Sequence, residues 1–77
     1  MRAPVSFAAG TDPLNMAFDG AHIWVGNNNG NSVTKLRASD GANLGTFPLG
    51  TNPTGIAFDG ANIWVALHVG GNAVVKM

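Results

Sequence analysis

Apolar and polar residues alternate along most of this chain in short runs, and clusters of Gly, Asn, Asp and Pro interrupt the runs. A period of two with many β-branched and aromatic residues is typical of strands, and no stretch shows the helical period. The pattern predicts strands over residues 15–18, 22–25, 32–37, 44–49, 55–58, 62–66 and 73–76. Asp-Gly pairs lie between several of these runs and are typical of hairpin turns. We therefore expect an all-β chain of meandering strands.

One motif occurs twice in the chain, forty residues apart. Residues 10–25 read GTDPLNMAFDGAHIWV, and residues 50–65 read GTNPTGIAFDGANIWV. Four strands in a repeat of this length are typical of one blade of a β-propeller. A single repeat cannot bury its own apolar faces, and two blades are too few to close a ring.

The N-terminus supplies an additional strand. The VSFAAG sequence of residues 5–10 aligns with GTFPLG at residues 45–50. The chain is thus expected to be a single unit, residues 1–77, with three parts: an isolated strand within residues 1–10, a full blade over 11–50 and a three-stranded partial blade over 51–77.

We expect the strand from Val5 to Ala8 to complete the three-stranded blade of a neighbouring copy. Such a contact is head to tail, and it closes a ring when the rotation between copies permits. Propellers have about four to eight blades, so two blades per chain allow a six-bladed trimer or an eight-bladed tetramer. The trimer is favoured, with the tetramer as the alternative.

Composition supports a need for partners. The chain has 77 residues, no cysteine, no glutamate and two histidines, so neither a disulfide nor a structural metal cage is expected. A domain this small usually needs such a link or oligomerisation. Charged residues make up 10% of the chain, against about 25% in ordinary globular proteins. This scarcity of charge suits a surface that partners cover.

Charge and hydropathy also exclude some partners. The net charge is zero and the four basic residues are scattered, whereas nucleic-acid binding needs a basic footprint. No apolar run is long enough for a membrane span, and the first residues lack the apolar core of a signal peptide. We expect no nucleic-acid or membrane partner, with the cytoplasm as the default location.

The sequence PTGIAFDGANIWV at residues 53–65, followed by NAVVK at residues 72–76, resembles the blades of streptogramin (virginiamycin B) lyase-like β-propellers. NHL-type blades are similar, and the two motif copies with the additional strand cover essentially the whole chain. The resemblance implies blades that run outward from a central channel. In that family, lyase activity depends on a metal held near histidine and glutamate side chains. Because this chain has no glutamate, no catalytic residue is transferred to it, and we expect no enzymatic activity and no cofactor.

The repeated Ile-Trp-Val sequence predicts packing between blades. Successive side chains of a strand point to opposite faces, so Ile23 and Val25 should face one neighbour and Trp24 the other. The residues expected to pack between blades are Phe18, Ile23, Trp24, Phe58, Ile63 and Trp64. A ligand-stacking role for the tryptophans is the alternative.

The turns at Asp19, Asp40 and Asp59 all fall at one end of the predicted blades, the lower end. A calcium site needs several oxygens converging in one loop, such as an Asp-x-Asp pattern, and none of these turns has one. Turns in which the aspartate accepts backbone N–H groups are expected instead.

The opposite, upper end carries most of the asparagines. The candidate ligand-binding residues are Asp12, Asn15, Asn27, Asn28, Asn29, Asn52 and His68. Amide groups both donate and accept hydrogen bonds, which suits neutral polar ligands such as carbohydrates. The alternative is that asparagine stands there because it tolerates left-handed turn conformations.

The sequence therefore predicts a self-assembling, non-catalytic propeller module with a polar ligand at the upper end of the channel. Two alternatives remain open at this stage. One is a metal-dependent, lyase-like enzyme in which ring symmetry repeats His68. The other is a fragment-derived or engineered chain without a function of its own.

Overall fold

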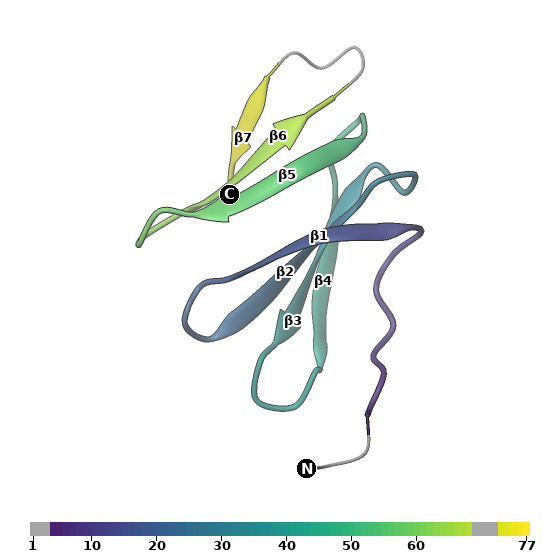
Figure 1. Ribbon diagram of the computed structural model, residues 1–77, viewed down its shortest axis with the longest axis vertical. Helices are drawn as coiled ribbons and strands as arrows, with labels where there is room; N and C mark the ends of the chain where they lie inside the picture. Colours follow the sequence, from purple (N-terminus) through teal and green to yellow (C-terminus); the bar gives the residue numbers. More distant parts are fainter. Residues whose placement is uncertain (1–3, 69–72) are drawn as a thin grey trace.

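The computed structural model describes residues 4–68 and 73–77, which form seven strands in two antiparallel sheets (Figure 1). Sheet 1 contains, in spatial order, β1 (Pro13–Phe18), β2 (His22–Asn27), β3 (Ser32–Arg37) and β4 (Asn43–Pro48). Sheet 2 contains β5 (Pro53–Phe58), β6 (Ile63–Leu67) and β7 (Val74–Lys76) in the same meandering order. The all-β prediction is confirmed.

Each of the seven predicted strands coincides with an observed strand, and the differences are at the ends. β1 begins at Pro13 and β5 at Pro53, two residues before the predicted starts. In both sheets the pairing register shifts just after this proline, between Pro13 and Asn15 and between Pro53 and Gly55. A proline at the first position of a strand followed by a bulge is compatible with its missing N–H group.

The Asp-Gly turns form as predicted. Gly20 and Gly60 both have a φ of 100°, a left-handed value that glycine adopts without steric cost. In the turn between β1 and β2, Asp19 Oδ1 accepts the backbone N–H groups of Ala21 and His22, at 2.9 and 2.7 Å. Asp59 makes the equivalent bonds in sheet 2. The predicted Asx turns are thereby confirmed at this end of each sheet.

The hydrophobic core lies between the two sheets. Trp24 and Val33 of sheet 1 pack with Ile63 and Val65 of sheet 2, and all four are buried. Trp24 pairs directly with Ala17 on β1, so the two side chains share one side of sheet 1. We call this side the tryptophan face of sheet 1, and the opposing side of sheet 2 its aliphatic face.

Each sheet has a second face that points outward. Met16, Val25 and Leu36 lie on the outer, aliphatic face of sheet 1 with Ile23, as the pairs Met16–Val25 and Ile23–Leu36 require. Trp64 lies on the outer, tryptophan face of sheet 2. The six residues predicted to pack between blades thus divide into three groups. Trp24 and Ile63 are in the core, Ile23 is half-buried, and Phe18, Phe58 and Trp64 are exposed in the single chain.

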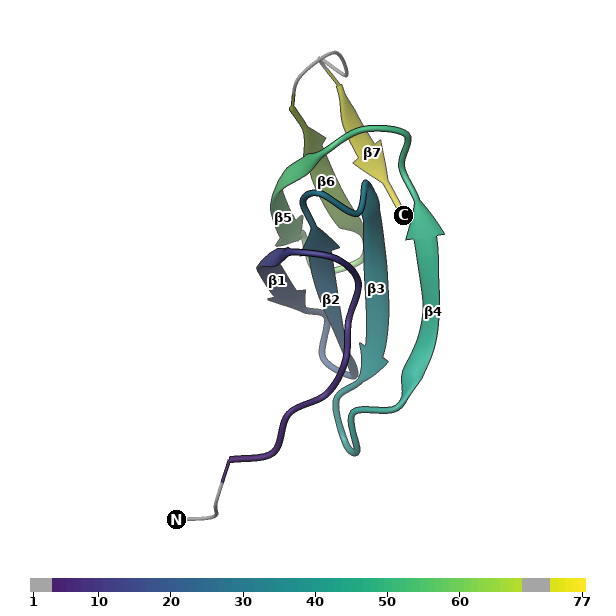
Figure 2. The ribbon, with the colours of Figure 1, turned by 90° about the vertical axis from the view of Figure 1, so that its right-hand side faces the viewer.

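The N-terminal segment takes a separate path. Residues 4–9 form no strand within the single chain. In both views the purple segment descends from the start of β1 on the side away from sheet 2 (Figure 1, Figure 2). The predicted pairing of the strand from Val5 to Ala8 involves a neighbouring copy and stays a prediction.

Candidate functional site

The loops at the upper end of both sheets are linked by hydrogen bonds. Asn28 N–H donates to the Asp12 carbonyl at 2.9 Å, and His68 N–H donates to the Asn52 carbonyl at 2.8 Å. These two bonds are repeat equivalents of one another, since each pair is displaced by forty residues. This bond is therefore the same in both repeats.

Asn28 connects the two repeats within the chain. Its Nδ2 donates to the carbonyl of Pro53 at 3.0 Å, and its Oδ1 accepts a long bond from Asn52 Nδ2 at 3.5 Å. Asn15 Nδ2 similarly donates to the carbonyl of Thr54. Asp12, Asn15, Asn28 and Asn52 thus lie close together at the upper end of the interface between the sheets.

Two other candidates are open to solvent. Asn29 is exposed and its Nδ2 donates to Asp12 Oδ2 at 2.9 Å, while His68 is also exposed. Asp12 has a φ of 58°, a left-handed conformation that aspartate adopts more readily than most residues. Polar atoms of Asp12, Asn29 and His68 are therefore available at the surface of this end.

Asn27 differs from the other candidates because it is completely buried. Its Nδ2 donates to Ser32 Oγ at 3.1 Å and to Thr34 Oγ1 at 2.9 Å, and its Oδ1 accepts Gly10 N–H at 3.0 Å. Buried polar groups need such partners, because an unpaired one is costly. The structure therefore gives Asn27 the role of fastening the N-terminal segment to sheet 1, and it does not reach the surface with the others.

The lower end holds a cluster that sequence reasoning missed. Trp24 Nε1 donates to Asp19 Oδ2 at 2.8 Å, and Lys35 Nζ lies 5.1 Å from the Trp24 ring centroid. His22 Nδ1 also lies 3.1 Å from Asp19 Oδ2. The aspartate thus orders both the turn, through Oδ1, and the indole, through Oδ2.

Sheet 2 repeats this cluster. Trp64 Nε1 donates to Asp59 Oδ2 at 2.6 Å, and Lys76 Nζ lies 5.8 Å from the Trp64 ring centroid. The hydrogen bond from the Trp64 indole has the largest effect on the pKa of Asp59, and those from the backbone N–H groups of Asn62 and Ala61 come next. Together they lower this pKa to about 2. The sequence contains a signal for this cluster, because aspartate and tryptophan are five residues apart in both repeats.

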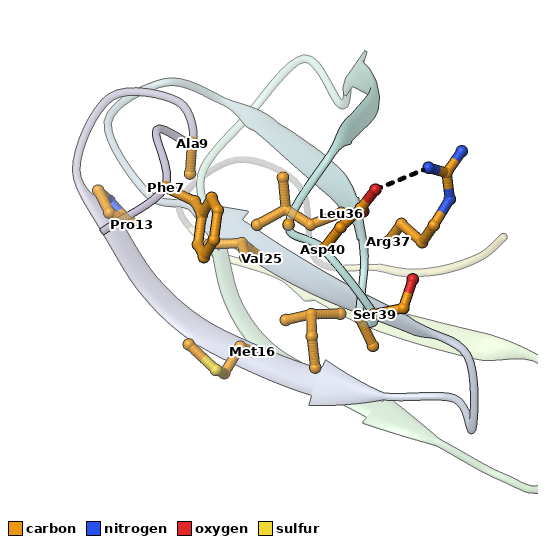
Figure 3. A pocket seen from close by; sticks show the side chains of 12 residues that line it. Phe7, Ala9, Pro13, Met16, Val25, Leu36, Arg37, Ser39 and Asp40 are labelled. Carbon is orange, nitrogen blue, oxygen red and sulfur yellow. Dashed lines mark hydrogen bonds and ion pairs between the residues drawn. The ribbon is translucent and has the colours of Figure 1, made fainter. Parts of the chain in front are cut away.

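A pocket of about 440 Å³ lies on the outer, aliphatic face of sheet 1 (Figure 3). Its walls are mostly apolar and include Phe7, Met16, Val25 and Leu36, and an ion pair of 3.1 Å between Arg37 and Asp40 lies at its edge. Few polar groups converge in it, so it is suited to an apolar occupant.

Within residues 4–68 and 73–77, no group of three or more His, Cys, Asp or Glu side chains is placed to hold a metal ion. Over the same residues, no helix is long and apolar enough to cross a membrane.

Comparison with models of protein families, with curated proteins and with solved structures gave no significant match to this chain.

Proposed function

We propose that this chain is a self-assembling β-propeller module, in which copies join head to tail into a ring and present their upper loops to a polar ligand. One observation carries the proposal. The two outward faces of the chain carry the repeat equivalents of the Trp, Ile and Val residues that already pack together in its core.

The equivalence follows from the forty-residue repeat. In the core, Trp24 of sheet 1 packs with Ile63 and Val65 of sheet 2. The repeat equivalents of these residues are Trp64, on the outer face of sheet 2, and Ile23 and Val25, on the outer face of sheet 1. The tryptophan face of one copy therefore matches the aliphatic face of the next, in the manner already used within the chain.

A contact of this kind uses two different surfaces, so it leads to a ring or to an open filament. A ring of three copies gives six blades and a ring of four gives eight, both within the range of natural propellers. The trimer is the favoured arrangement. The strand from Val5 to Ala8 joins the copies further by adding to the free edge of β7, where no strand pairs among the described residues.

Light scattering coupled to size exclusion tests the assembly. The expected mass is three times that of the 7.9 kDa chain, unchanged over a range of concentrations well above the dissociation constant. Four times that mass supports the tetramer. A folded monomer at high concentration, or a mass that grows without limit as concentration rises, would contradict the ring.

The upper loops favour binding rather than catalysis. The amide groups among them, such as the exposed Asn29, donate and accept hydrogen bonds but do not exchange protons near neutral pH. Ring closure would repeat Asp12, Asn29 and Asn52 around the channel mouth, giving a wide array of weak polar contacts. A neutral oligosaccharide fits such an array.

Titration calorimetry with a panel of neutral oligosaccharides tests this part separately. Asn29→Ala is expected to weaken binding at least threefold, because each copy then loses one exposed amide. Asn62→Ala, at the lower end of sheet 2, is the matched control and should leave binding unchanged. Equal effects of the two changes, or no binding by any sugar of the panel, would contradict a carbohydrate site at the upper end.

A further inference from the structure

The fourth strand of sheet 1 covers its tryptophan, and sheet 2 has no such strand among its described residues. Phe47 on β4 lies 6.2 Å from Trp24 between ring centroids, at an interplanar angle of 32°. Trp24 is only 9% exposed, whereas its equivalent Trp64 is 38% exposed. Val33, which pairs with Phe47, is fully buried, whereas Val74 is 63% exposed. Trp64 and Val74 therefore lack both the facing sheet and the aromatic residue that cover their equivalents.

The N-terminal segment carries the missing aromatic residue. Phe7 is the repeat equivalent of Phe47, in the aligned strings VSFAAG and GTFPLG. In the single chain Phe7 is half exposed and lies directly over Gly41, where any side chain would collide with its ring. It also lines the pocket on the aliphatic face of sheet 1, beside Val25 (Figure 3).

We propose, on the basis of the head-to-tail assembly above, that Phe7 of one copy packs on Trp64 of the next copy, and that Trp64 enters the pocket which Phe7 now lines. Within the chain, Trp24 lies against Ile63 and Val65 with Phe47 at its edge. The same arrangement between copies places Trp64 against Ile23 and Val25. Phe7 then covers the indole, and the partner for both side chains is a second copy of this chain.

The register of the exchanged strand follows from the pairing of β3 with β4. Val33 pairs with Phe47 and Thr34 pairs with Thr46. Their repeat equivalents place Phe7 opposite Val74 and Ser6 opposite Val75 of the next copy. The pairing should become irregular beyond Ser6. Gly45, the equivalent of Val5, has a φ of 146° that a valine does not readily adopt.

Asn27 fixes where the exchanged segment leaves its own copy. Gly10 N–H is bonded to the buried amide of Asn27 at 3.0 Å. The segment therefore changes direction within Ala8 and Ala9, which are small and more exposed than Asn27. Gly10 and everything after it keep their positions while Phe7 moves from the pocket to the neighbouring sheet.

Cysteine cross-linking tests the register, since the chain has no cysteine of its own. Chains with Ser6→Cys and chains with Val75→Cys are unfolded together, refolded and oxidised. Opposed residues of antiparallel strands lie about 4.5–5.5 Å apart between Cα atoms, within the range of a disulfide. The expected product is a covalent pair with one chain of each kind. Ala8→Cys mixed with Val75→Cys is the control, two residues out of register on the same face, and should cross-link far less.

The outcomes separate this proposal from the proposed function. If the wild-type chain is a monomer by light scattering, the assembly itself fails. If it assembles but the shifted pair cross-links as well as the aligned pair, or neither does, the register and the Phe7–Trp64 contact are wrong while the ring remains.

A second measurement does not depend on the cysteine variants. Dilution of the wild-type assembly should shift tryptophan emission to longer wavelength, mainly through Trp64, because Trp24 is already buried. Phe7→Ala should raise the dissociation constant about tenfold or more, as truncation of a central aromatic residue does at interfaces. Val5→Ala is the matched control and should change it much less. An equal effect of the two changes would overturn the contact.

Discussion

At the scale of single residues, the repeated bond from tryptophan to aspartate has the clearest consequence for stability. The Trp24 indole and then the Ala21 backbone N–H lower the pKa of Asp19 well below its usual range, and Trp64 acts in the same way on Asp59. The free carboxyl has a pKa of about 3.9. Because the pKa values of these two carboxyls are lower in the folded chain, their contribution to the free energy of unfolding is complete above about pH 4. This contribution is lost as the pH falls towards 2.

We therefore predict that the free energy of unfolding is constant from pH 7 to about 5 and declines between about pH 4 and 2. Asp19→Asn should lower stability at pH 7 and weaken this acid dependence, because the variant has no proton to gain at that site. Ser39→Ala, an exposed change in a neighbouring turn, serves as the control. Urea denaturation followed by circular dichroism at fixed protein concentration measures all three proteins. An acid dependence of Asp19→Asn equal to that of the wild type would contradict the argument.

Asn27 gives the second prediction at this scale. Asn27→Ala removes one partner each of Gly10 N–H, Ser32 Oγ and Thr34 Oγ1 in one step, and among the described residues only Thr34 keeps a second partner, Thr46. Buried groups left unpaired cost about 1–3 kcal/mol, so the free energy of unfolding should fall by about that amount. Hydrogen exchange at the Gly10 amide should also become faster. Asn29→Ala, at an exposed neighbouring position, should stay within about 0.5 kcal/mol of the wild type, and similar losses for both would contradict the assignment.

The burial of Asn27 could not be predicted from the sequence. The asparagines of residues 27–29 look equivalent in the sequence, but β2 extends to Asn27 and places only that side chain on the outer face of sheet 1, where it is buried beside Gly10. A strand end displaced by two residues decides whether an amide is buried or exposed. In contrast, the Asp19 turn was predictable because Asp-Gly sets its own local geometry.

At the scale of elements, the period-two pattern located all seven strands, because each run is short and ends in a turn with its own sequence signal. The path of residues 4–9 was less accessible to prediction. A strand needs a partner edge, and the edge proposed for this segment belongs to another copy. Local propensity marks a segment as able to pair, but it does not indicate where the pairing edge lies.

The turns provide a test at this scale. An added Cβ at Gly20 would meet no atom within 4 Å, yet Gly20 has a φ of 100°. Gly20→Ala should therefore destabilise the protein by about 1–2 kcal/mol through backbone strain alone. Gly55→Ala, in β5, is the matched control: its new Cβ would lie 3.8 Å from Ala66 Cβ, an ordinary contact. That change should be neutral or stabilising by up to about 1 kcal/mol. Thermal unfolding compares the two, and equal losses would exclude the conformational explanation.

At the scale of the whole molecule, the chain has a core between two sheets and a matching pair of faces outside them, of which the one on sheet 1 is partly covered by the N-terminal segment. Equivalence of the repeats predicts that the faces match, but the number of copies in the proposed ring would depend on the rotation between adjacent sheets. Six and eight blades differ by a modest change in that rotation. The sequence contains no direct signal for it, because side-chain packing at the interface sets the angle.

Removal of the N-terminal segment is the most direct test of the molecule as one cooperative assembly. A chain without residues 1–10 loses Phe7 and the Gly10 bond to Asn27, so sheet 2 of its neighbour gains no fourth strand. If assembly and folding are coupled, the melting temperature of the full chain rises with concentration by mass action. The shortened chain should be smaller by light scattering and should melt at a lower temperature that is independent of concentration. Removal of residues 1–3 alone, which leaves Phe7 and Gly10 in place, should preserve both the mass and the concentration dependence. If the shortened chain assembles into the same number of copies as the full chain and melts in the same way, the copies do not exchange this strand.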